Sequence, residues 1–280
     1  MARHWMPAAL APIPGLALVA VLSACGEDAA ADAAPVTVRF EATVNGAPFA
    51  CGATYPAFGP FSGPVQAGDL RLYVHDLEML SATGAATPIA LSADGAWQSD
   101  RLAYLDFEDG TGGCLNGTAA TRAVVEGAAP AGDYVGLRFT VGVPFDLNHG
   151  DPVRATAPLG RTAMHWGWQG GHKFLRLSLT DGDTDSLIHL GSTGCQGTVA
   201  HVTGCDRPNR AVVTVTGFDP TTTPVRLDVA ALLDALRPGE DATCMGDTAT
   251  YACAGVFQAL GLDLQTGAPT APAGAFSAGG

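Results

Sequence analysis

The sequence has few positively charged residues and no cluster of them. Its 280 residues include 14 Lys and Arg against 27 Asp and Glu, so the formal net charge is -13 at pH 7. Nucleic-acid binding depends on Lys and Arg that neutralise phosphates, and an acidic chain without a basic patch repels that ligand. The composition therefore argues against nucleic acid as a partner.

The motifs of common hydrolases and nucleotide enzymes are also missing. The chain contains no G-x-S-x-G elbow, no H-E-x-x-H, no P-loop and no G-x-G-x-x-G after an expected strand. No two cysteines have the C-x-x-C spacing of a zinc or redox site, so a thiolate metal cage is not expected. An unfamiliar catalytic geometry stays open.

Long apolar runs are confined to the N-terminus. Residues 8–22 are mostly apolar, follow Arg3 and end in Leu22-Ser23-Ala24-Cys25, which has the form of a bacterial lipobox. We expect residues 1–24 to be a lipoprotein signal peptide and Cys25 to carry the lipid. No later run approaches the roughly 20 apolar residues of a spanning helix, so the lipid would be the only membrane attachment. This places the protein in the periplasm or at the cell surface, and Gly26 after Cys25 favours the outer membrane.

Six cysteines remain once Cys25 is assigned to lipid. An even number in an exported protein favours disulfides. We expect Cys195 with Cys205 and Cys244 with Cys253 as local loops, and Cys51 with Cys114 as the long-range bridge, although spacing alone does not determine the connectivity.

Alternation of apolar and polar residues predicts an all-β fold. The two-residue period of a half-buried strand begins at Val36. It recurs over residues 69–80, 135–143, 173–179, 187–190 and 211–217, separated by Gly-rich turns. This pattern is typical of a β-sandwich of mainly antiparallel strands. Short helices are expected only at residues 229–236, with Asp228 as N-cap, and at 253–260.

The same patterns divide the chain. Residues 25–35 are an alanine-rich acidic stretch, expected to be a flexible tether. The β-sandwich is predicted over residues 36–237 and a disulfide-pinned appendix over 238–265. The Gly, Ala, Pro and Ser composition of residues 266–280 predicts a flexible tail.

Residues 164–168, Met-His-Trp-Gly-Trp, are the first candidate for chemistry. In a regular strand Met164, Trp166 and Trp168 share one face and His165 takes the other, unless a bulge at Gly167 redirects them. Core packing of the tryptophans is the alternative.

Three further histidines are candidate metal ligands. His189 lies in a strand expected to pair with residues 173–179 through a turn at 181–186, with Ser178 facing His189 on the polar side. His149 lies in a loop after the strand that ends near Val143, and His75 lies in a strand before Asp76. Structural roles remain the alternative for each. The acidic turn itself could also open a calcium loop, but it lacks the required Gly and the closing Glu.

Long ordered phrases in this sequence resemble the MbnP family, bacterial periplasmic copper-binding proteins also described as four-Cys members of a "metallo-mystery pair". The likeness extends over most of residues 36–236. The matching phrases are DLRLYVHD at 69–76, LDFE at 105–108 with Cys114, GVPF at 142–145 through NHGDP at 148–152, WGWQGGHKF at 166–174, HLGSTGC at 189–195, and Cys205 before PN at 208–209.

The resemblance implies a β-rich periplasmic protein that is not an enzyme. Its partner would be a MauG-like di-haem protein that oxidises a tryptophan to kynurenine, and Trp166 and Trp168 are the candidates for this modification. Ligands for copper map onto His75, His149 and His189, with His165 as a fourth. His172 stands where relatives are expected to have tyrosine, so it is not assigned as a ligand.

Soft, low-coordinate sites favour Cu(I). The expected function is copper storage, delivery or uptake by a lipid-anchored protein. Two other hypotheses remain: a surface scaffold or adhesive lipoprotein without a stoichiometric metal, and an extracytoplasmic enzyme that uses a metal or a histidine base in the same cleft.

Overall fold

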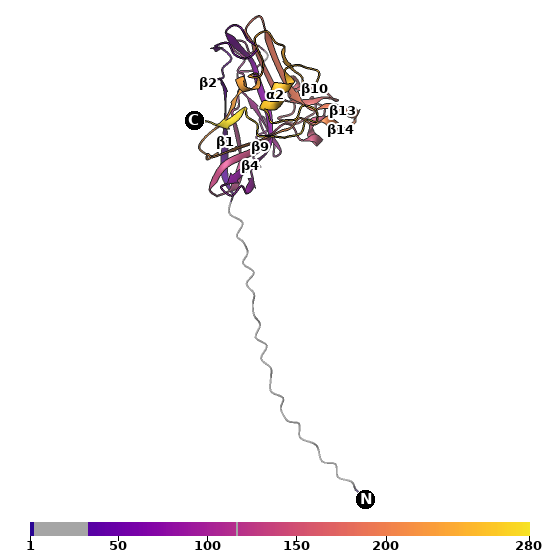
Figure 1. Cartoon of the computed structure of the whole chain (residues 1–280). Helices are drawn as coiled ribbons and strands as arrows, with labels where there is room; N and C mark the ends of the chain where they lie inside the picture. Colours follow the sequence, from indigo (N-terminus) through magenta and orange to yellow (C-terminus); the bar gives the residue numbers. More distant parts are fainter. Residues whose placement is uncertain (3–32, 116) are drawn as a thin grey trace. The chain divides into compact units, whose positions relative to one another are not determined.

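A computed structural model describes residues 1, 2, 33–115 and 117–280 (Figure 1). Most of the expected signal peptide, Cys25 with its expected lipid, and residues 26–32 of the expected tether lie outside the described residues. Over the described part of the chain, no helix is both long and apolar enough to cross a membrane.

The larger of two principal sheets is built around one long strand, β4 (Val65–Ser81). Along its path the order is β15-β9-β4-β11-β12-β17, and four short strands attach beside it. The bounds of its other strands are β3 Thr54–Tyr55, β5 Ala86–Pro88, β7 Leu102–Asp106, β9 Tyr134–Val141, β10 His165–Gly167, β11 Gly171–Thr180, β12 Asp185–Gly191, β15 Ala211–Thr216 and β17 Ala242–Cys244.

The second sheet has the order β18-β16-β1-β8-β6, with β2 paired to β1. Its strands are β1 Ala33–Val44, β2 Ala47–Pro48, β6 Ala90–Leu91, β8 Val124–Pro130, β16 Val225–Asp228 and β18 Phe276–Ala278. All pairings are antiparallel except β1 with β16 and, in the larger sheet, β12 with β17. The all-β prediction of mainly antiparallel strands is confirmed.

A third, two-stranded sheet is the hairpin of β13 (Thr193–Thr198) and β14 (His201–Arg207). Figure 1 shows the hairpin projecting from the body of the described unit beside β10. Because it pairs with no other strand, the main sheets do not depend on its hydrogen bonds.

Helices are few and short. They are α1 Phe145–Asn148, α2 Cys253–Ala259 and the 3-10 turns η1 Thr162–Met164 and η2 Val229–Leu232. The helix predicted at 253–260 is confirmed. The one predicted at 229–236 is only a 3-10 turn, although Asp228 does cap it by accepting the N–H of Ala230.

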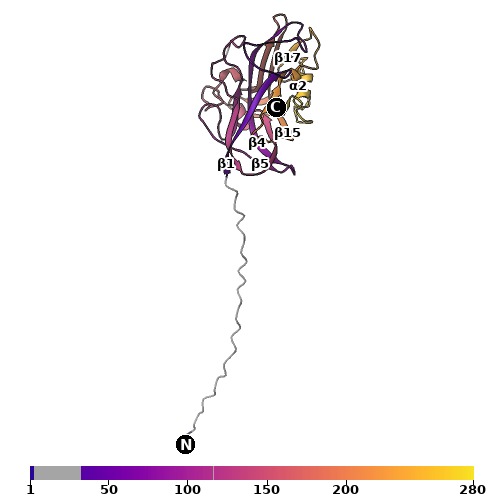
Figure 2. The same ribbon diagram turned by 90° about the vertical axis from the view of Figure 1, so that its left-hand side faces the viewer.

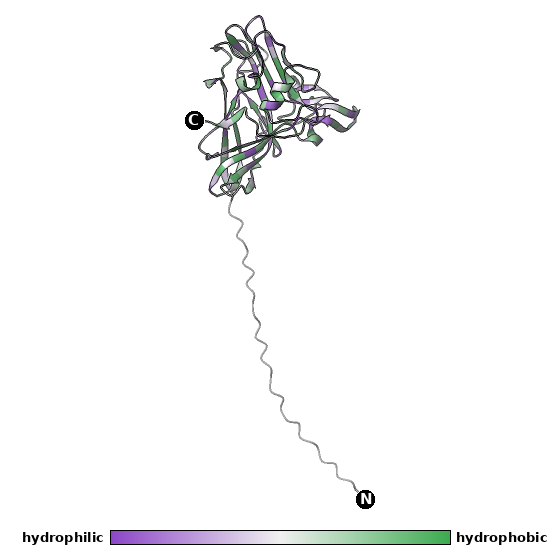
Figure 3. Ribbon diagram, in the orientation of Figure 1, coloured by the Kyte–Doolittle hydropathy of each residue, from purple (hydrophilic) through white to green (hydrophobic). Residues whose placement is uncertain are grey.

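A hydrophobic core fills the space between the two principal sheets. Phe40 of β1 lies edge-on to Phe139 of β9 at 5.4 Å, and Phe139 in turn contacts Phe276 of β18 at 5.5 Å. Hydrophobic and hydrophilic residues alternate along many of the strands (Figure 3). This alternation gives one sheet face to the core and leaves the other for polar groups.

The C-terminal third is part of this core. Residues 33–115 and 117–280 belong to one compact unit, and β17 extends the larger sheet beside β12. Figure 2 shows α2 next to β17, and both Cys244 and Cys253 are buried in the core. The expected appendix at 238–265 does carry its disulfide, Cys244–Cys253, and its strand β17 is part of the larger sheet.

Both predicted flexible ends are also corrected where they are described. Ala33, at the end of the expected tether, already pairs with Pro130 in the β1–β8 ladder. In the expected tail, Phe276 pairs with Leu227, and Gly279 donates its N–H to Pro224. Composition predicted flexibility because small residues bury little area, but here the backbone supplies the hydrogen bonds.

All three disulfides have the expected partners: Cys51–Cys114, Cys195–Cys205 and Cys244–Cys253. The hairpin predicted at residues 173–190 is present, but its register differs by two residues. His189 faces Arg176, not Ser178. The difference arises because the turn is shorter than expected, with β12 beginning at Asp185.

The acidic turn is a hairpin turn, not a calcium loop. Asp181 Oδ1 accepts the N–H groups of Asp183 and Thr184, and Oδ2 accepts those of Ser62 and Gly63. These backbone hydrogen bonds lower the pKa of Asp181 to about 2. The carboxylate is therefore used to hold the turn against a neighbouring loop.

Candidate metal centre

The polar face of the larger sheet carries the candidate site. Along β4, Asp69, Arg71 and His75 share one face with Tyr73 and alternate with Leu70, Leu72 and Val74 of the central core. The segment between β9 and β11 packs over this face. Tyr73 donates its hydroxyl hydrogen to the carbonyl of Pro158 at 3.2 Å. This covering segment contains His149, His165 and both tryptophans singled out in the sequence.

His149 ends α1 and has a defined tautomer. Its Nδ1 lies 2.9 Å from the carbonyl oxygen of Trp168, which can only accept, so Nδ1 carries the proton. The lone pair is then on Nε2, which lies 3.2 Å from Asn148 Nδ2 and 3.6 Å from Cys205 Sγ. A histidine that donates one ring N–H to a carbonyl and leaves the other nitrogen free is the usual form of a metal ligand.

His165 lies at the start of β10, where the ladder to β11 is irregular before Gly167. Its Nδ1 accepts the N–H of Gly167 at 3.0 Å, while its Nε2 is buried without a hydrogen-bond partner. Burial, followed by the charge of His172, lowers the pKa of His165 to about 4. The ring is therefore neutral at pH 7, with one nitrogen unsatisfied.

His149, His165 and Trp168 line the same cavity, of about 350 Å³. Gly150, Asp151, Pro152, Gly167 and Val199 complete its wall. Val199, at the tip of the β13–β14 hairpin, is 73% exposed. Burial, partly offset by the hydrogen bond to Trp168, also lowers the pKa of His149. Two neutral imidazoles and an indole thus border one space.

Trp166 borders a different cavity, of about 440 Å³, together with Met245 and residues 192–195. Its ring lies on Gly191, where a Cβ would come within 2.5 Å of the indole. The ring of His189 is 6.2 Å away. Both tryptophans are only half-buried and border cavities, so the alternative of simple core packing describes neither well.

His189 lies in a positively charged environment. Burial, and then Lys173 and Arg176, lower the pKa of His189 to about 4. No hydrogen bond joins its ring to another part of the described chain. Its nitrogens are available to a ligand, but nearby cations disfavour a positively charged metal ion.

His75 is buried at the other end of the polar face. Its Nδ1 approaches Asp76 Oδ2 at 2.9 Å, although neither ring nitrogen has an aligned hydrogen bond. Asp76 has a positive φ of 51°, which marks the irregularity in β4 between its pairings with β9. Burial, opposed by Asp76, lowers the pKa of His75. This histidine lines neither cavity that a tryptophan borders.

His172 is not positioned as a ligand. Its ring is fully buried, with Nδ1 2.8 Å from the carbonyl of Asn148 and Nε2 3.1 Å from that of Leu159. Both nitrogens therefore face acceptors. His172 packs 4.7 Å from His165 and helps to fix the wall of the cavity.

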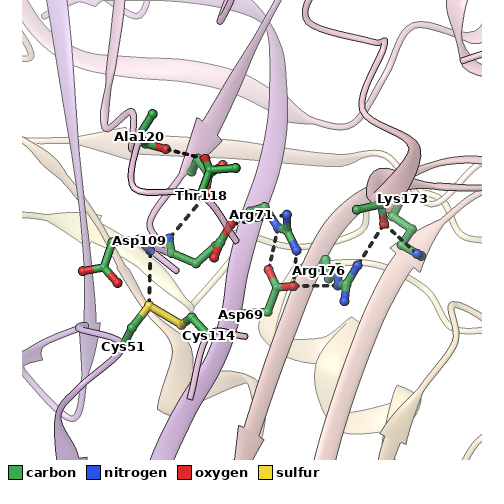
Figure 4. Close-up of polar contacts among 12 residues, drawn as sticks. Cys51, Asp69, Arg71, Asp109, Cys114, Thr118, Ala120, Lys173 and Arg176 are labelled. Carbon is green, nitrogen blue, oxygen red and sulfur yellow. Dashed lines mark hydrogen bonds and ion pairs between the residues drawn. A yellow bond between two sulfur atoms is a disulfide. The ribbon is translucent and has the colours of Figure 1, made fainter. Parts of the chain in front are cut away.

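A buried ionic network supports the covering segment (Figure 4). Asp69 pairs with Arg71 on its own strand and with Arg176 Nε at 2.8 Å. Arg176 and Lys173 both donate to the carbonyl of Ala163, at 3.0 and 2.9 Å. Since Ala163 precedes His165 by two residues, this network holds the start of the His165–Trp168 stretch against the sheet.

The network continues toward the Cys51–Cys114 disulfide. Arg71 Nη1 lies 3.4 Å from Glu108 Oε1, and the N–H of Asp109 points to Cys51 Sγ at 3.4 Å (Figure 4). Burial, and then the charge of Glu108, raise the pKa of Asp106 to about 6. The interior of this face thus holds several ionisable groups whose charges depend on one another.

The four histidines predicted as ligands do not form one preassembled set. Within the described ranges, one group of at least three ligand-type residues has its atoms within 4.8 Å of one another, and it is His149 with Cys195 and Cys205. Sequence reasoning missed this proximity, because the hairpin register that brings the cysteines to the histidine is not visible in the spacing. It also missed Met245, which borders the Trp166 cavity because β17 pairs with β12.

The fold and site define a disulfide-linked all-β protein with a histidine and tryptophan cavity. The model of the MbnP family matches residues 33–246, and the chain belongs to that family. MbnP from Methylosinus trichosporium is similar in structure, with a TM-score of 0.77 and 33% sequence identity; the match covers 88% of this chain and 98% of that one. A search of curated proteins found no significant match. Membership in this family is compatible with a copper-related role.

Proposed function

We propose that this chain is a lipid-anchored copper-binding protein outside the cytoplasm, and that it is a substrate of a di-haem oxidase, not an enzyme itself. Copper is held by His149 and His165 together with a kynurenine formed from Trp168. The observation that carries this proposal is the single cavity lined by those three side chains.

The donor atoms fit a soft metal ion. His149 has its proton on Nδ1 and its lone pair on Nε2, and burial keeps both histidines neutral at pH 7. For His165 to bind through its unsatisfied Nε2, its proton must move to Nδ1 and the N–H of Gly167 must turn away. Gly167 has a φ of +131° and open space around it, so this adjustment is accessible. Imidazoles in a low-coordinate site suit copper, and softness favours Cu(I).

Trp168 is favoured over Trp166 by electrostatics. The histidine beside Trp166 is His189, whose pKa is lowered by burial and then by the nearby cations Lys173 and Arg176. Positive charge disfavours both the removal of electrons from an indole and the binding of a cation. The Trp168 cavity is lined by the acidic residue Asp151 instead.

Oxidation of the tryptophan creates metal-binding lone pairs, which an indole lacks. Cleavage of the C2–C3 bond adds an oxygen atom to each carbon, and hydrolysis then releases formate, leaving a ketone and an aryl amine. Two equivalents of peroxide, acting through the di-haem partner, supply the four oxidising equivalents and are reduced to water. The ketone oxygen and the amine nitrogen carry lone pairs that can complete a copper site beside two imidazoles.

The test compares protein produced with and without an active di-haem partner and peroxide. We expect the partner to remove one carbon and add one oxygen, by intact mass, and to produce stoichiometric copper retention. Trp168→Phe should abolish both effects, and Trp166→Phe should leave both. Unchanged mass and no copper in folded protein would instead support a surface scaffold without a metal.

A further inference from the structure

The β13–β14 hairpin brings a disulfide directly to the free nitrogen of His149. Cys195 and Cys205 face each other across the hairpin, and Cys205 Sγ lies 3.6 Å from His149 Nε2. All three ligand-type atoms lie within 4.8 Å of one another. While the sulfurs are bonded to each other they are not thiolates and do not bind a metal strongly.

The distances suit a metal once the disulfide is opened. Metal–nitrogen bonds of about 2.0 Å and metal–sulfur bonds of about 2.3 Å place nitrogen and sulfur roughly 3.5 to 3.7 Å apart around one ion. The observed 3.6 Å between His149 and Cys205 already has this length. Only the bonded sulfurs must separate.

The fold makes this disulfide the most accessible one. Cys51, Cys114, Cys244 and Cys253 are at most 2% exposed and are joined through the interior, whereas Cys205 is half-buried. Among the described strands the hairpin pairs only with itself, so its cysteines can move without breaking either principal sheet. A reductant therefore reaches Cys195–Cys205 before the other two.

His149 can bind a metal through the same nitrogen in either the sulfur site or the kynurenine site. Its Nδ1–H is held by the carbonyl of Trp168, so Nε2 is the nitrogen that binds in both cases. At present Nε2 accepts from Asn148 Nδ2 at 3.2 Å, a hydrogen bond that any metal must displace. Since one nitrogen cannot serve two ions, a sulfur site and the kynurenine site exclude each other.

We propose that Cys195, Cys205 and His149 form a redox-gated site for a soft d10 ion, Cu(I), that is created when a dithiol reductant opens the Cys195–Cys205 disulfide. The reductant becomes a disulfide, and two electrons and two protons pass to the cysteine sulfurs. Binding of the ion displaces those protons, and His149 Nε2 supplies the third ligand. The proposal shares His149 with the proposed function but does not require an oxidised tryptophan.

The experiment uses protein made without the di-haem partner, so that both tryptophans are unmodified. Brief treatment with a dithiol reductant is followed by its anaerobic removal, alkylation of a sample, and mass mapping. Among the six cysteines of the three disulfides, we expect alkylation at Cys195 and Cys205 only. The reduced protein should then bind Cd²⁺ with the ultraviolet charge-transfer band of metal thiolates, and should take Cu(I) from a chromophoric chelator.

Two variants separate this site from others. Cys195→Ser with Cys205→Ser should show no thiolate band under the same treatment. His149→Gln should keep the free thiols but bind Cu(I) about tenfold or more weakly, since loss of even an outer-shell partner of a ligand costs about 10- to 100-fold. Earlier reduction of the core disulfides, or a thiolate band and Cu(I) affinity unchanged by His149→Gln, would overturn the proposal. Failure of the tryptophan to be oxidised would overturn only the proposed function.

Discussion

The ring of His149 donates its Nδ1–H to the backbone carbonyl of Trp168 at 2.9 Å, across 19 residues of sequence. This one hydrogen bond joins α1 to the end of the tryptophan segment and decides which nitrogen of His149 is free. It also means that a metal bound at Nε2 is coupled to the position of Trp168. The copper proposal therefore depends more on this pair than on any other contact.

Replacement of His149 should have the largest effect on copper. Mutation of a residue that only supports a metal ligand typically lowers metal affinity by about 10- to 100-fold. We therefore expect His149→Gln to weaken copper by about 100-fold or more in kynurenine-containing protein. Competition with a chromophoric chelator measures it.

His75→Gln is the matched control, because the sequence resemblance also assigned His75 as a ligand. Since His75 lines neither tryptophan cavity, its replacement should change copper affinity by less than about tenfold, the lower value for an outer-shell partner. Equal losses in both variants would show that copper is bound elsewhere on the polar face.

The stability of the metal-free protein should fall as pH is lowered from about 6.5 to about 4. Burial holds the pKa of His165 and of His189 at about 4, and lowers it for His75, His149 and His172. The unfolded chain, with histidine pKa near 6.5, therefore binds more protons over this interval, and protonation favours unfolding. Urea unfolding at a series of pH values measures the slope.

Asp106 acts in the opposite sense. Its pKa of about 6 means that the folded protein binds a proton that an unfolded aspartate releases near pH 3.8. Asp106→Asn removes this opposing contribution, so stability should depend more steeply on pH than in the unaltered protein. A flat profile in both proteins would contradict the buried, neutral histidines described above.

Loss of the Asp69 carboxylate should be strongly destabilising. Asp69→Asn leaves the buried Arg71 and the partly buried Arg176 without their shared anion. Removal of one partner from a buried ion pair typically costs about 3–5 kcal/mol. Arg101→Gln breaks an exposed, solvent-screened pair with Asp146 and should change the unfolding free energy far less than Asp69→Asn. Similar costs for the two variants, by denaturant unfolding, would show that the network contributes little.

A methyl group at Gly171 should disturb the site through Asn148. A Cβ there would lie 2.5 Å from the carbonyl oxygen of Asn148 and 2.7 Å from its Nδ2, at a φ of +70°. Gly171→Ala should therefore cost about 2 kcal/mol or more and weaken copper binding by displacing His149. At Gly204 no atom lies within 4 Å of a built Cβ, so Gly204→Ala should stay within about 0.5 kcal/mol. Unchanged copper affinity in folded Gly171→Ala protein would show that Asn148 does not position His149 for copper binding.

Alternation and turn composition were enough to predict the strands and the all-β class. β4, β9, β11, β12 and β15 all lie where the two-residue period indicated them. The period does not record which strands pair. The β12–β17 ladder joins residues more than fifty positions apart, and its hydrogen bonds placed the expected appendix within the sheet.

The site residues were harder to group from sequence. Strand alternation correctly put His189 on the polar side of its strand. It did not predict that Arg176 would face His189 across the ladder. The convergence of His149, His165 and Trp168 depends on an irregular covering segment with a bulge at β10, and periodicity carries no information about such backbone. The sequence could therefore name the residue types of the chemistry but not the cavity that unites them.

The most direct test is to digest protein that has been treated with the active di-haem partner and peroxide, and to map the modified residue by mass spectrometry. The account predicts that kynurenine forms at Trp168, with Trp166 unchanged, and that the same sample retains stoichiometric copper. Kynurenine at Trp166, or an unmodified chain that binds copper equally well, would contradict it.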